Sequence, residues 1–258
     1  IKSMSNLSDE QISIYEEPVN ERVRKFIKIE SYFDKMIYFK NKEDKYDSDS
    51  ALHTLCELYE LLSRSDLKSE LIREIESHNQ YFKKIKEIEG TDINKLNSLL
   101  EKQDSLLTLL HSVKSNYLDY LTNDILFKTI YKNFRSPLQP AAVDYWLTRD
   151  SVWRTNNFDL WIEPLRFIKE STNFILTLIR KSGNFQDKNA EKGFYIQKLD
   201  QNKNIQLVRI TLSSDVYYYP QISVGKQRIN IMFMTKDEAN NLVQYQEDVP
   251  FLLTICCL

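Results

Sequence analysis

The sequence predicts an α+β fold in which a mainly helical N-terminal domain is followed by a small antiparallel β domain. Apolar residues recur at the spacing of amphipathic helices over most of the chain, as far as Gly183. Beyond Gly193 the spacing changes to the alternation that is typical of strands. Because a run of helices precedes a run of strands, the two kinds of element should form segregated layers rather than a wound parallel sheet.

Length and composition indicate how these elements are organised. The chain has 258 residues, of which 42% are hydrophobic and 28% charged, proportions typical of a globular protein with a substantial core. We predict a helical domain over 17–183 and a β domain over 184–258. A strand at 11–16 could join the β domain, because apolar and polar residues alternate there.

Helical periodicity and capping residues define the elements of the first domain. Ser65 or Asp66 can cap one helix and Asp92 the next, and Gly90 supplies a stop between them. Pro164 should be tolerated within the first turns of the last helix. The charged stretch 40–50 is expected to be a loop, and short helices or irregular structure should precede the last helix. We expect helices over 20–39, 51–63, 65–90, 92–121, 125–134 and 157–183.

The β domain is predicted from six stretches that alternate or are continuously apolar. Short polar turns such as "DQNKN" separate them. The expected strands are "GFYIQKL", "IQLVRITL", "DVYYYPQIS", "KQRINIMFM", "LVQY" and "PFLLTICCL". The sheet should be small and antiparallel.

Several classes of protein are disfavoured by what the sequence lacks. No stretch reaches the roughly 18 apolar residues of a membrane span, and the N-terminus lacks the apolar centre of a secretory signal, so we expect a cytoplasmic protein that does not bind membranes. The three cysteines fit free thiols in a reducing compartment. His53, His78 and His111 do not have the spacing of metal ligands, so neither a metal nor a cofactor is expected.

Catalytic motifs are also missing. The four glycines are isolated from one another, which excludes the phosphate-binding and dinucleotide-binding loops. No serine nucleophile elbow occurs, and no carboxylate pair stands out from the many acidic residues. We therefore do not expect an enzyme. A hydrolase or transferase whose active site follows no known motif remains an alternative, for which a pocket with convergent titratable groups would be required.

The uneven distribution of basic residues along the chain is the feature that indicates most about a binding partner. Between Lys192 and Met234 there are six basic and two acidic residues, a local charge of +4 in a chain whose net charge is −2. The basic residues are Lys192, Lys198, Lys203, Arg209, Lys226 and Arg228. In "KQRINIMFM" the apolar residues alternate with Lys226 and Arg228, so both basic side chains should point away from the core of the sheet.

The first predicted helix repeats this pattern. Arg24, Lys28 and Lys35 share one face of it, and Arg64 with Lys68 could extend such a surface from the junction of the next two helices. The simple alternative for each residue is an ordinary solvated surface charge. Their collective bias favours an acidic partner. A nucleic acid bound by the basic sheet and the tyrosines at 217–219 is an alternative, although no nucleic-acid-binding motif occurs.

Particular stretches of the sequence resemble those of the ZapD family of bacterial Z-ring-associated proteins. They are "EEPVNERVRKFIKIE", "ALHTLCELYELLSRSDLKSEL", "KGFY", "YPQISVGKQRINIMF" and the "CC" near the end. The resemblance implies a non-enzymatic homodimer without cofactors that acts at the division site at midcell. It would bind the C-terminal tail of FtsZ and cross-link FtsZ protofilaments.

The resemblance also implies which residues bind the tail. Basic side chains lining a pocket are the family's binding feature, and Arg24, Lys28, Arg64 and Arg228 occupy matching positions, with Lys28 replacing an arginine. The charge pattern adds Lys68 and Lys226 to the residues predicted to bind the partner. The resemblance also implies departures, because Met232, Ile125 and Asp144 stand at positions that can be basic in relatives. The recognition surface could therefore be narrower or shifted.

Overall fold

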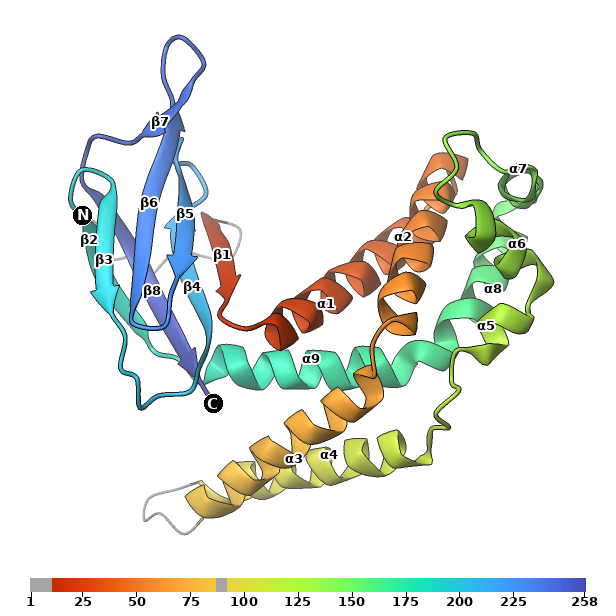
Figure 1. Cartoon of the computed structure of the whole chain (residues 1–258), viewed down its shortest axis with the longest axis horizontal. Helices are drawn as coiled ribbons and strands as arrows, with labels where there is room; N and C mark the ends of the chain where they lie inside the picture. The colour runs from red at the N-terminus through yellow and green to blue at the C-terminus, as the bar shows by residue number, and fades with distance from the viewer. Residues whose placement is uncertain (1–10, 87–91) are drawn as a thin grey trace. The chain divides into compact units, whose positions relative to one another are not determined.

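The protein, described here by a computed structural model of residues 11–86 and 92–258, has the predicted α+β fold (Figure 1). After one N-terminal strand, helices precede a set of antiparallel strands along the chain. The chain divides into two compact units. The β unit comprises Ile1–Lys25, described from residue 11, together with Leu176–Leu258, and the helical unit comprises Phe26–Ile175. The boundary at 183/184 expected from the sequence stays a prediction.

The β unit contains two antiparallel sheets. The first has the strand order β1-β4-β8-β2 and the second the order β3-β6-β5, with β7 also paired to β6. The N-terminal strand β1 therefore pairs with β4 in the first sheet. The strands are β1 (Ile12–Pro18), β2 (Phe185–Ala190), β3 (Phe194–Lys198), β4 (Ile205–Ser213), β5 (Tyr219–Val224), β6 (Arg228–Lys236), β7 (Leu242–Gln244) and β8 (Val249–Cys257).

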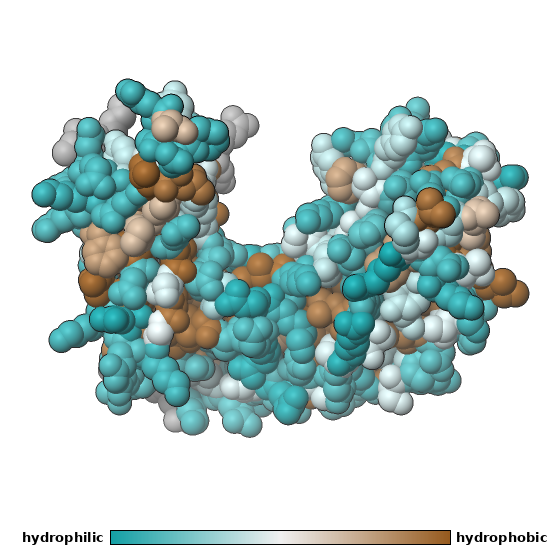
Figure 2. All heavy atoms as spheres, turned by 45° about the horizontal axis from the view of Figure 1, so that its top comes forward, coloured by the Kyte–Doolittle hydropathy of each residue, from teal (hydrophilic) through white to brown (hydrophobic). Residues whose placement is uncertain are grey.

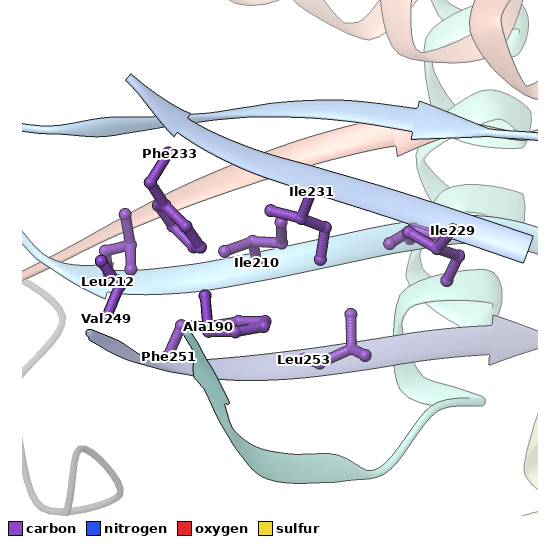
Figure 3. Close-up of a cluster of buried hydrophobic side chains, with 10 residues drawn as sticks. Ala190, Ile210, Leu212, Ile229, Ile231, Phe233, Val249, Phe251 and Leu253 are labelled. Carbon is purple, nitrogen blue, oxygen red and sulfur yellow. The ribbon is translucent and has the colours of Figure 1, made fainter. Parts of the chain in front are cut away.

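Alternating side chains of both sheets meet in one apolar core (Figure 3). From β6, Ile229, Ile231 and Phe233 point inward and are fully buried. They meet residues of β4 and β8, among which Ile210 and Phe251 are labelled in Figure 3. Since burial of each such side chain is worth about 1.5–3 kcal/mol, this core fixes which face of β6 is left for solvent.

Aspartate side chains cap the N-termini of many helices in the helical unit. Five of the helices have an aspartate N-cap whose carboxylate accepts a hydrogen bond from a backbone N–H of the first turn: Asp44, Asp66, Asp92, Asp124 and Asp150. The caps predicted at Asp66 and Asp92 are confirmed. The helices are α1 (Glu21–Lys40), α2 (Lys45–Ser63), α3 (Leu67–Ile85), α4 (Ile93–Ser112), α5 (Asp119–Asn123), α6 (Ile125–Asn133), α7 (Ala141–Leu147), α8 (Ser151–Ile162) and α9 (Arg166–Lys181).

Three predicted helix boundaries were wrong. Helix α2 begins at Lys45 within the expected loop, because Asp44 caps it. The expected helix over 92–121 ends at Ser112, and a separate short helix follows. The last long helix is divided in two, because Pro164 lies in a 3₁₀ turn between α8 and α9 rather than inside one helix.

The sequence patterns also missed a strand and misplaced the start of another. Strand β2 reads "FQDKNA", which has no apolar alternation, and it is held by antiparallel pairing with β8. Strand β6 begins at Arg228, so Lys226 lies in the turn before it rather than in the strand. The predicted stop at Gly90 lies outside the described residues.

Candidate partner-binding surface

The outward side of β6 is the surface on which the predicted residue Arg228 lies. Inward and outward residues alternate along this strand, and Arg228 is exposed beside the fully buried Ile229. Lys198 of β3 lies directly across from Arg228 in the register, and two residues further along the strands Ile196 lies across from Asn230. We call the outward side of β3, β6 and β5 the outer face. It carries two cations at one end and exposed apolar side chains, including Phe194 and Ile196, further along.

A pocket of about 430 Å³ opens in the β unit next to the cationic end of the outer face. Lys226 of the β5–β6 turn and Lys203 of the β3–β4 loop line it, together with Val19 from the end of β1. Backbone hydrogen bonds hold these segments together: Val19 N donates to Gln206 O over 2.9 Å, and Leu199 N donates to Gln227 O over 2.8 Å. The pocket is therefore formed by three segments that are distant in sequence.

Arg24 lies in the first turn of α1, five residues after Val19, and its side chain is half exposed, but acidic neighbours already hold its guanidinium. Its Nη2 lies 3.0 Å from Glu17 Oε1 and 3.3 Å from the carbonyl oxygen of Pro18, and its Nε lies 3.3 Å from Glu21 Oε1. The hydrogen bond to Glu17 raises the pKa of Arg24. An incoming carboxylate would have to compete with Glu17 and Glu21 for this side chain.

Lys226 and Arg228 differ from Arg24 in this respect. Among the residues that the structure describes, neither of them takes part in an ion pair, and both are exposed. Their charges are consequently available to a partner in solution without the loss of an internal contact. Lys198 is exposed in the same way and adds a third cation.

The other three predicted residues belong to the helical unit. Lys28 is exposed on α1, with its Nζ 5.5 Å from the ring centre of Tyr32. Lys68 donates a hydrogen bond from its Nζ to the carbonyl oxygen of Val113, the residue that follows α4. This contact uses part of the hydrogen-bonding capacity of Lys68 inside the protein.

Arg64 lies in a cluster that the sequence did not predict. The carboxylate of Glu60 pairs with Arg64 on the same helix and with Arg135 after α6. The hydrogen bond from Arg135 lowers the pKa of Glu60. Both arginine side chains are mostly exposed, and with Tyr131 they line a shallow pocket of about 310 Å³. A single acidic residue therefore faces two guanidinium groups here.

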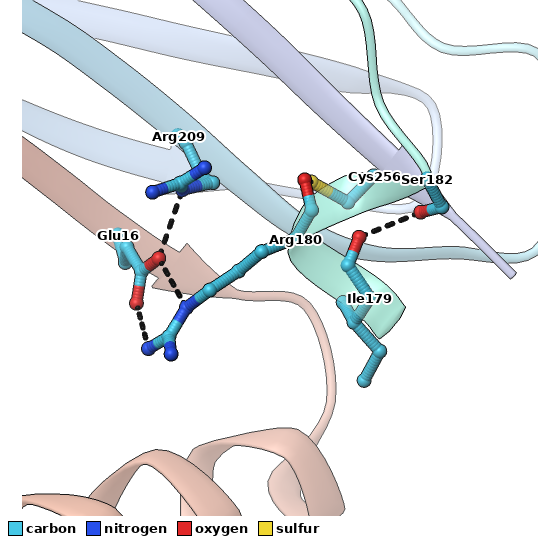
Figure 4. Close-up of polar contacts among 6 residues, drawn as sticks. All are labelled: Glu16, Ile179, Arg180, Ser182, Arg209 and Cys256. Carbon is cyan, nitrogen blue, oxygen red and sulfur yellow. Dashed lines mark hydrogen bonds and ion pairs between the residues drawn. The ribbon is translucent and has the colours of Figure 1, made fainter. Parts of the chain in front are cut away.

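One of the basic residues counted from the sequence is not part of any open surface. Arg209 Nε lies 2.9 Å from Glu16 Oε1, and the same carboxylate binds Arg180 through two bonds of 2.8 and 2.9 Å (Figure 4). The side chains of Glu16 and Arg209 are only 16% and 17% exposed. The local charge of +4 thus overstates the positive charge that the sheet presents, because β1 supplies the carboxylate that neutralises Arg209.

The structure brings together those predicted binding residues that belong to the β unit. Whether Lys28, Arg64 and Lys68 of the helical unit join them in one site stays a prediction. Lys226 and Arg228 lie within one turn and strand of the β unit, near the segment that leads to Arg24. Sequence reasoning did not select Lys198 or Lys203 as binding residues. The register of β3 against β6 and the path of the β3–β4 loop place them, and neither is visible as a sequence motif.

The three positions at which the resemblance implies a departure from the family pattern are all accessible or partly accessible. Met232 lies half-buried on the outer face, across from Phe194. Ile125 is 82% exposed at the start of α6. Asp144 accepts a hydrogen bond of 2.6 Å from Gln139 Nε2. Apolar side chains thus reach the surface among the polar ones in both units, as the brown patches of Figure 2 show.

Other chemistry receives little support from the described residues. Within 11–86 and 92–258 no cluster of three or more His, Cys, Asp or Glu residues is arranged to hold a metal ion. None of the helices in these ranges is long and apolar enough to cross a membrane. Cys56, Cys256 and Cys257 are free thiols, and burial raises the pKa of Cys56 to about 12 and that of Cys256 to about 11.

The fold and this surface define an α+β protein with a two-sheet β unit, a helical unit and an exposed basic strand end. Comparison with known proteins identifies the family. The chain matches the ZapD family, described as a cell division protein, over residues 27–232. It is 31% identical over 252 residues to the cell division protein ZapD of Methylococcus capsulatus. The matched region covers 95% of this chain and 98% of the relative. The ZapD proteins of Nitrosomonas eutropha and Azoarcus sp. are each 28% identical over 249 residues, with 95% of this chain and 99% of each relative covered. The chain therefore belongs to the ZapD family of cell division proteins, which gives it a role in cell division.

Proposed function

We propose that this protein is a non-enzymatic division factor that binds the C-terminal tail of FtsZ and cross-links FtsZ protofilaments at midcell, in the cytoplasm. The observation that carries the proposal is a pair of exposed cations, Lys226 and Arg228, that have no acidic partner within 11–86 and 92–258, in a chain of the ZapD family. Lys198 beside them and Lys203 in the adjacent pocket extend this basic region.

The tail would bind by becoming ordered on this surface. A flexible acidic peptide loses conformational entropy when it binds, so each contact is individually weak. Its carboxylates would pair with the cations at the end of β6, and its apolar side chains would lie along Phe194 and Ile196 of the outer face. Arg228 can hold a carboxylate through two parallel hydrogen bonds, whereas Lys226 supplies a point charge.

Binding sites of low affinity can hold filaments together when several of them are engaged at once. A homodimer presents two binding surfaces, and a filament presents many tails at high local concentration. The second contact of a dimer is therefore made at an effective concentration in the millimolar range, which turns modest site affinity into filament bundling. The dimer is part of the proposed mechanism.

Co-sedimentation with polymerised FtsZ tests the proposal. FtsZ that carries its C-terminal tail should pull the protein into the pellet and form bundles visible by electron microscopy. FtsZ that polymerises but lacks the tail should leave the protein in the supernatant. Equal pelleting with both forms of FtsZ would contradict the proposal, and so would absence of pelleting with either.

A further inference from the structure

Three helices of the helical unit line a pocket of about 220 Å³, which we call the α2–α7 pocket. It lies where α2 and α6 approach α7, which both of them contact (Figure 1). Helix α2 contributes one stripe of side chains, at positions 49, 52, 53 and 56, because residues three and four apart share a face of a helix. The opposite wall comes from α6, the segment that follows it and the start of α7. The pocket therefore lies wholly within the helical unit.

Apolar side chains form most of the wall of this pocket. They are Leu52, Cys56, Ile130, Phe134, Pro140 and Val143. All of these except Phe134 and Pro140 are buried. The ring of Phe134 is held from two sides, because it packs edge-on against His53 with 5.8 Å between the ring centres and stacks on Tyr131 at 5.3 Å. Since this wall is already ordered, little entropy is lost in fixing it when a ligand binds.

Asp49 determines the charge of the pocket. All of the lining residues lie in the described part of the chain, and among them Asp49 is the only acidic one, while none is a lysine or an arginine. Asp49 is half-buried, and within 11–86 and 92–258 no hydrogen bond or ion pair holds its carboxylate. Burial raises the pKa of Asp49, His53 partly offsets this shift, and nearby Asp144 adds to it. The carboxylate has thus lost part of its hydration without gaining a donor, so a cation that donates hydrogen bonds would stabilise it.

Two other polar residues of the lining also suit a donor. Gln139 donates a hydrogen bond of 2.6 Å from its Nε2 to Asp144 Oδ1, which leaves its carbonyl oxygen to act as an acceptor. The hydroxyl oxygen of Ser136 accepts a hydrogen bond of 3.3 Å from the backbone N–H of Leu138 and has a second lone pair. An ammonium group has three donors and no acceptor. It therefore matches these oxygens in a way that a carboxylate or a phosphate does not.

We propose that the α2–α7 pocket binds a small organic cation, namely an amine with an apolar body. Its ammonium group pairs with the carboxylate of Asp49, and its apolar part lies against Leu52, Ile130 and Val143. An anion would be repelled by Asp49, and a neutral molecule would cover this carboxylate without pairing it. A metal ion is a poor match, because most of the wall offers carbon atoms where an ion requires several oxygen or nitrogen ligands.

The size of the pocket limits the ligand. Its volume of about 220 Å³ is below the roughly 300–1,000 Å³ of pockets for drug-sized molecules, whereas a cavity of roughly 150 Å³ is enough for one benzene ring. One ring or a short alkyl chain with a single amine therefore fits. The ring of Phe134 can add a cation–π contact. None of the residues predicted to bind FtsZ lines this pocket, so the inference does not depend on the proposed function.

Three ligands that share one ring and differ in charge test the proposal in saturation-transfer NMR titrations of the full chain at neutral pH. Benzylamine is a cation, benzyl alcohol is neutral and benzoate is an anion. Benzylamine should bind with a dissociation constant on the order of 0.1–1 mM. Benzyl alcohol should bind about tenfold more weakly, because it lacks the charge-assisted hydrogen bond, and benzoate should not bind.

A neutral substitution of the carboxylate locates the site. Asp49→Asn keeps the shape of the pocket and should weaken benzylamine binding about tenfold or more, while benzyl alcohol binding stays the same. The variant should fold, because it removes a half-buried charge that no internal partner holds, and its unfolding midpoint in urea should be at least that of the unmodified chain. Asp47→Asn is the matched control, because Asp47 lies on the same helix, outside the pocket and 4.0 Å from Lys42 Nζ, and it should bind benzylamine normally.

Each of the other outcomes would overturn the inference. Equal affinity for benzylamine and benzyl alcohol would mean that the carboxylate contributes nothing, and preference for benzoate would mean that the site takes anions. Benzylamine binding that Asp49→Asn leaves intact would place the ligand elsewhere, and absence of binding would leave no site. Co-sedimentation of Asp49→Asn with FtsZ should equal that of the unmodified chain, so failure of this inference and failure of the proposed function are distinguishable.

Discussion

At the scale of single residues, the use of a charged side chain depends on its neighbours in space. Arg228 and Arg209 both lie on strands of the β unit and look alike in the sequence. Alternation along β6 was enough to predict that Arg228 faces away from the core. No pattern predicted that Arg209 binds Glu16, because the carboxylate comes from the other end of the chain. Local periodicity reports the direction of a side chain but not its partner.

Reversal of charge at Arg228 should abolish FtsZ binding without affecting the fold. Arg228→Glu removes no internal ion pair of the described residues, so its unfolding midpoint in urea should match that of the unmodified chain. Co-sedimentation with FtsZ should be lost. Lys236→Glu is the matched control, because Lys236 is exposed at the opposite end of the same strand and should keep binding. Equal loss in both variants would indicate that net charge matters and the position does not.

Arg24→Glu is also expected to lose FtsZ binding, but unlike Arg228→Glu it should reduce the stability of the fold as well. The reversed residue would stand beside Glu17 and Glu21, and three neighbouring carboxylates repel one another. A modest loss of stability should therefore accompany the loss of binding. Arg24→Gln separates the two effects, because it removes the cation without adding a carboxylate. Binding by Arg24→Gln at full strength would exclude Arg24 from the site.

Glu16 is the residue whose loss should weaken the β unit most. Glu16→Ala leaves two largely buried guanidinium groups, those of Arg180 and Arg209, without this carboxylate. Since removal of one partner from a poorly solvated ion pair leaves an uncompensated charge, we expect a loss of about 2 kcal/mol in the free energy of unfolding. Urea denaturation followed by circular dichroism measures it. Glu21→Ala is the exposed control, and a similar loss there would contradict the argument.

At the scale of elements, the sequence predicted the existence of helices and strands better than their ends. The six expected strands and the long helices are present, because each has an apolar face that must be buried. The start of α2 depends on a single capping residue, Asp44, inside a stretch that otherwise reads as a charged loop. Strand β2 has no apolar pattern, since its pairing with β8 alone defines it.

One capping residue also connects two helices. Asp124 accepts a hydrogen bond of 2.7 Å from Phe127 N at the start of α6, and its other oxygen accepts one of 3.1 Å from Trp161 Nε1 of α8. Asp124→Ala removes the cap and leaves a buried indole N–H without a partner, so we expect a loss of about 2 kcal/mol. Asp150→Ala removes only a cap and should cost about 1 kcal/mol. Equal losses in chemical denaturation would show that the bond to Trp161 contributes nothing.

At the scale of the whole molecule, the candidate site is harder to predict than the fold because it is assembled from separate segments. The basic pocket of the β unit uses the end of β1, the β3–β4 loop and the β5–β6 turn. Charge counting found Lys226 and Arg228, since both stand beside a strong strand signal. It counted Lys203 among the basic residues but did not select it for the site, because its position depends on the path of a polar loop. The pairing of β3 with β6 similarly determines the position of Lys198.

Salt should weaken the proposed binding of the FtsZ tail. The tail is held mainly by exposed cations, and the screening length falls from about 10 Å at 0.1 M salt to about 3 Å at 1 M. Raising the salt concentration should therefore release the protein from FtsZ polymers, as co-sedimentation over a series of salt concentrations would measure. Because Arg228 and Lys226 are exposed, their attraction to carboxylates is screened more strongly than that of a largely buried ion pair such as Arg209–Glu16. Pelleting that stays the same between about 0.1 M and about 1 M salt would contradict a binding surface made mainly of exposed cations.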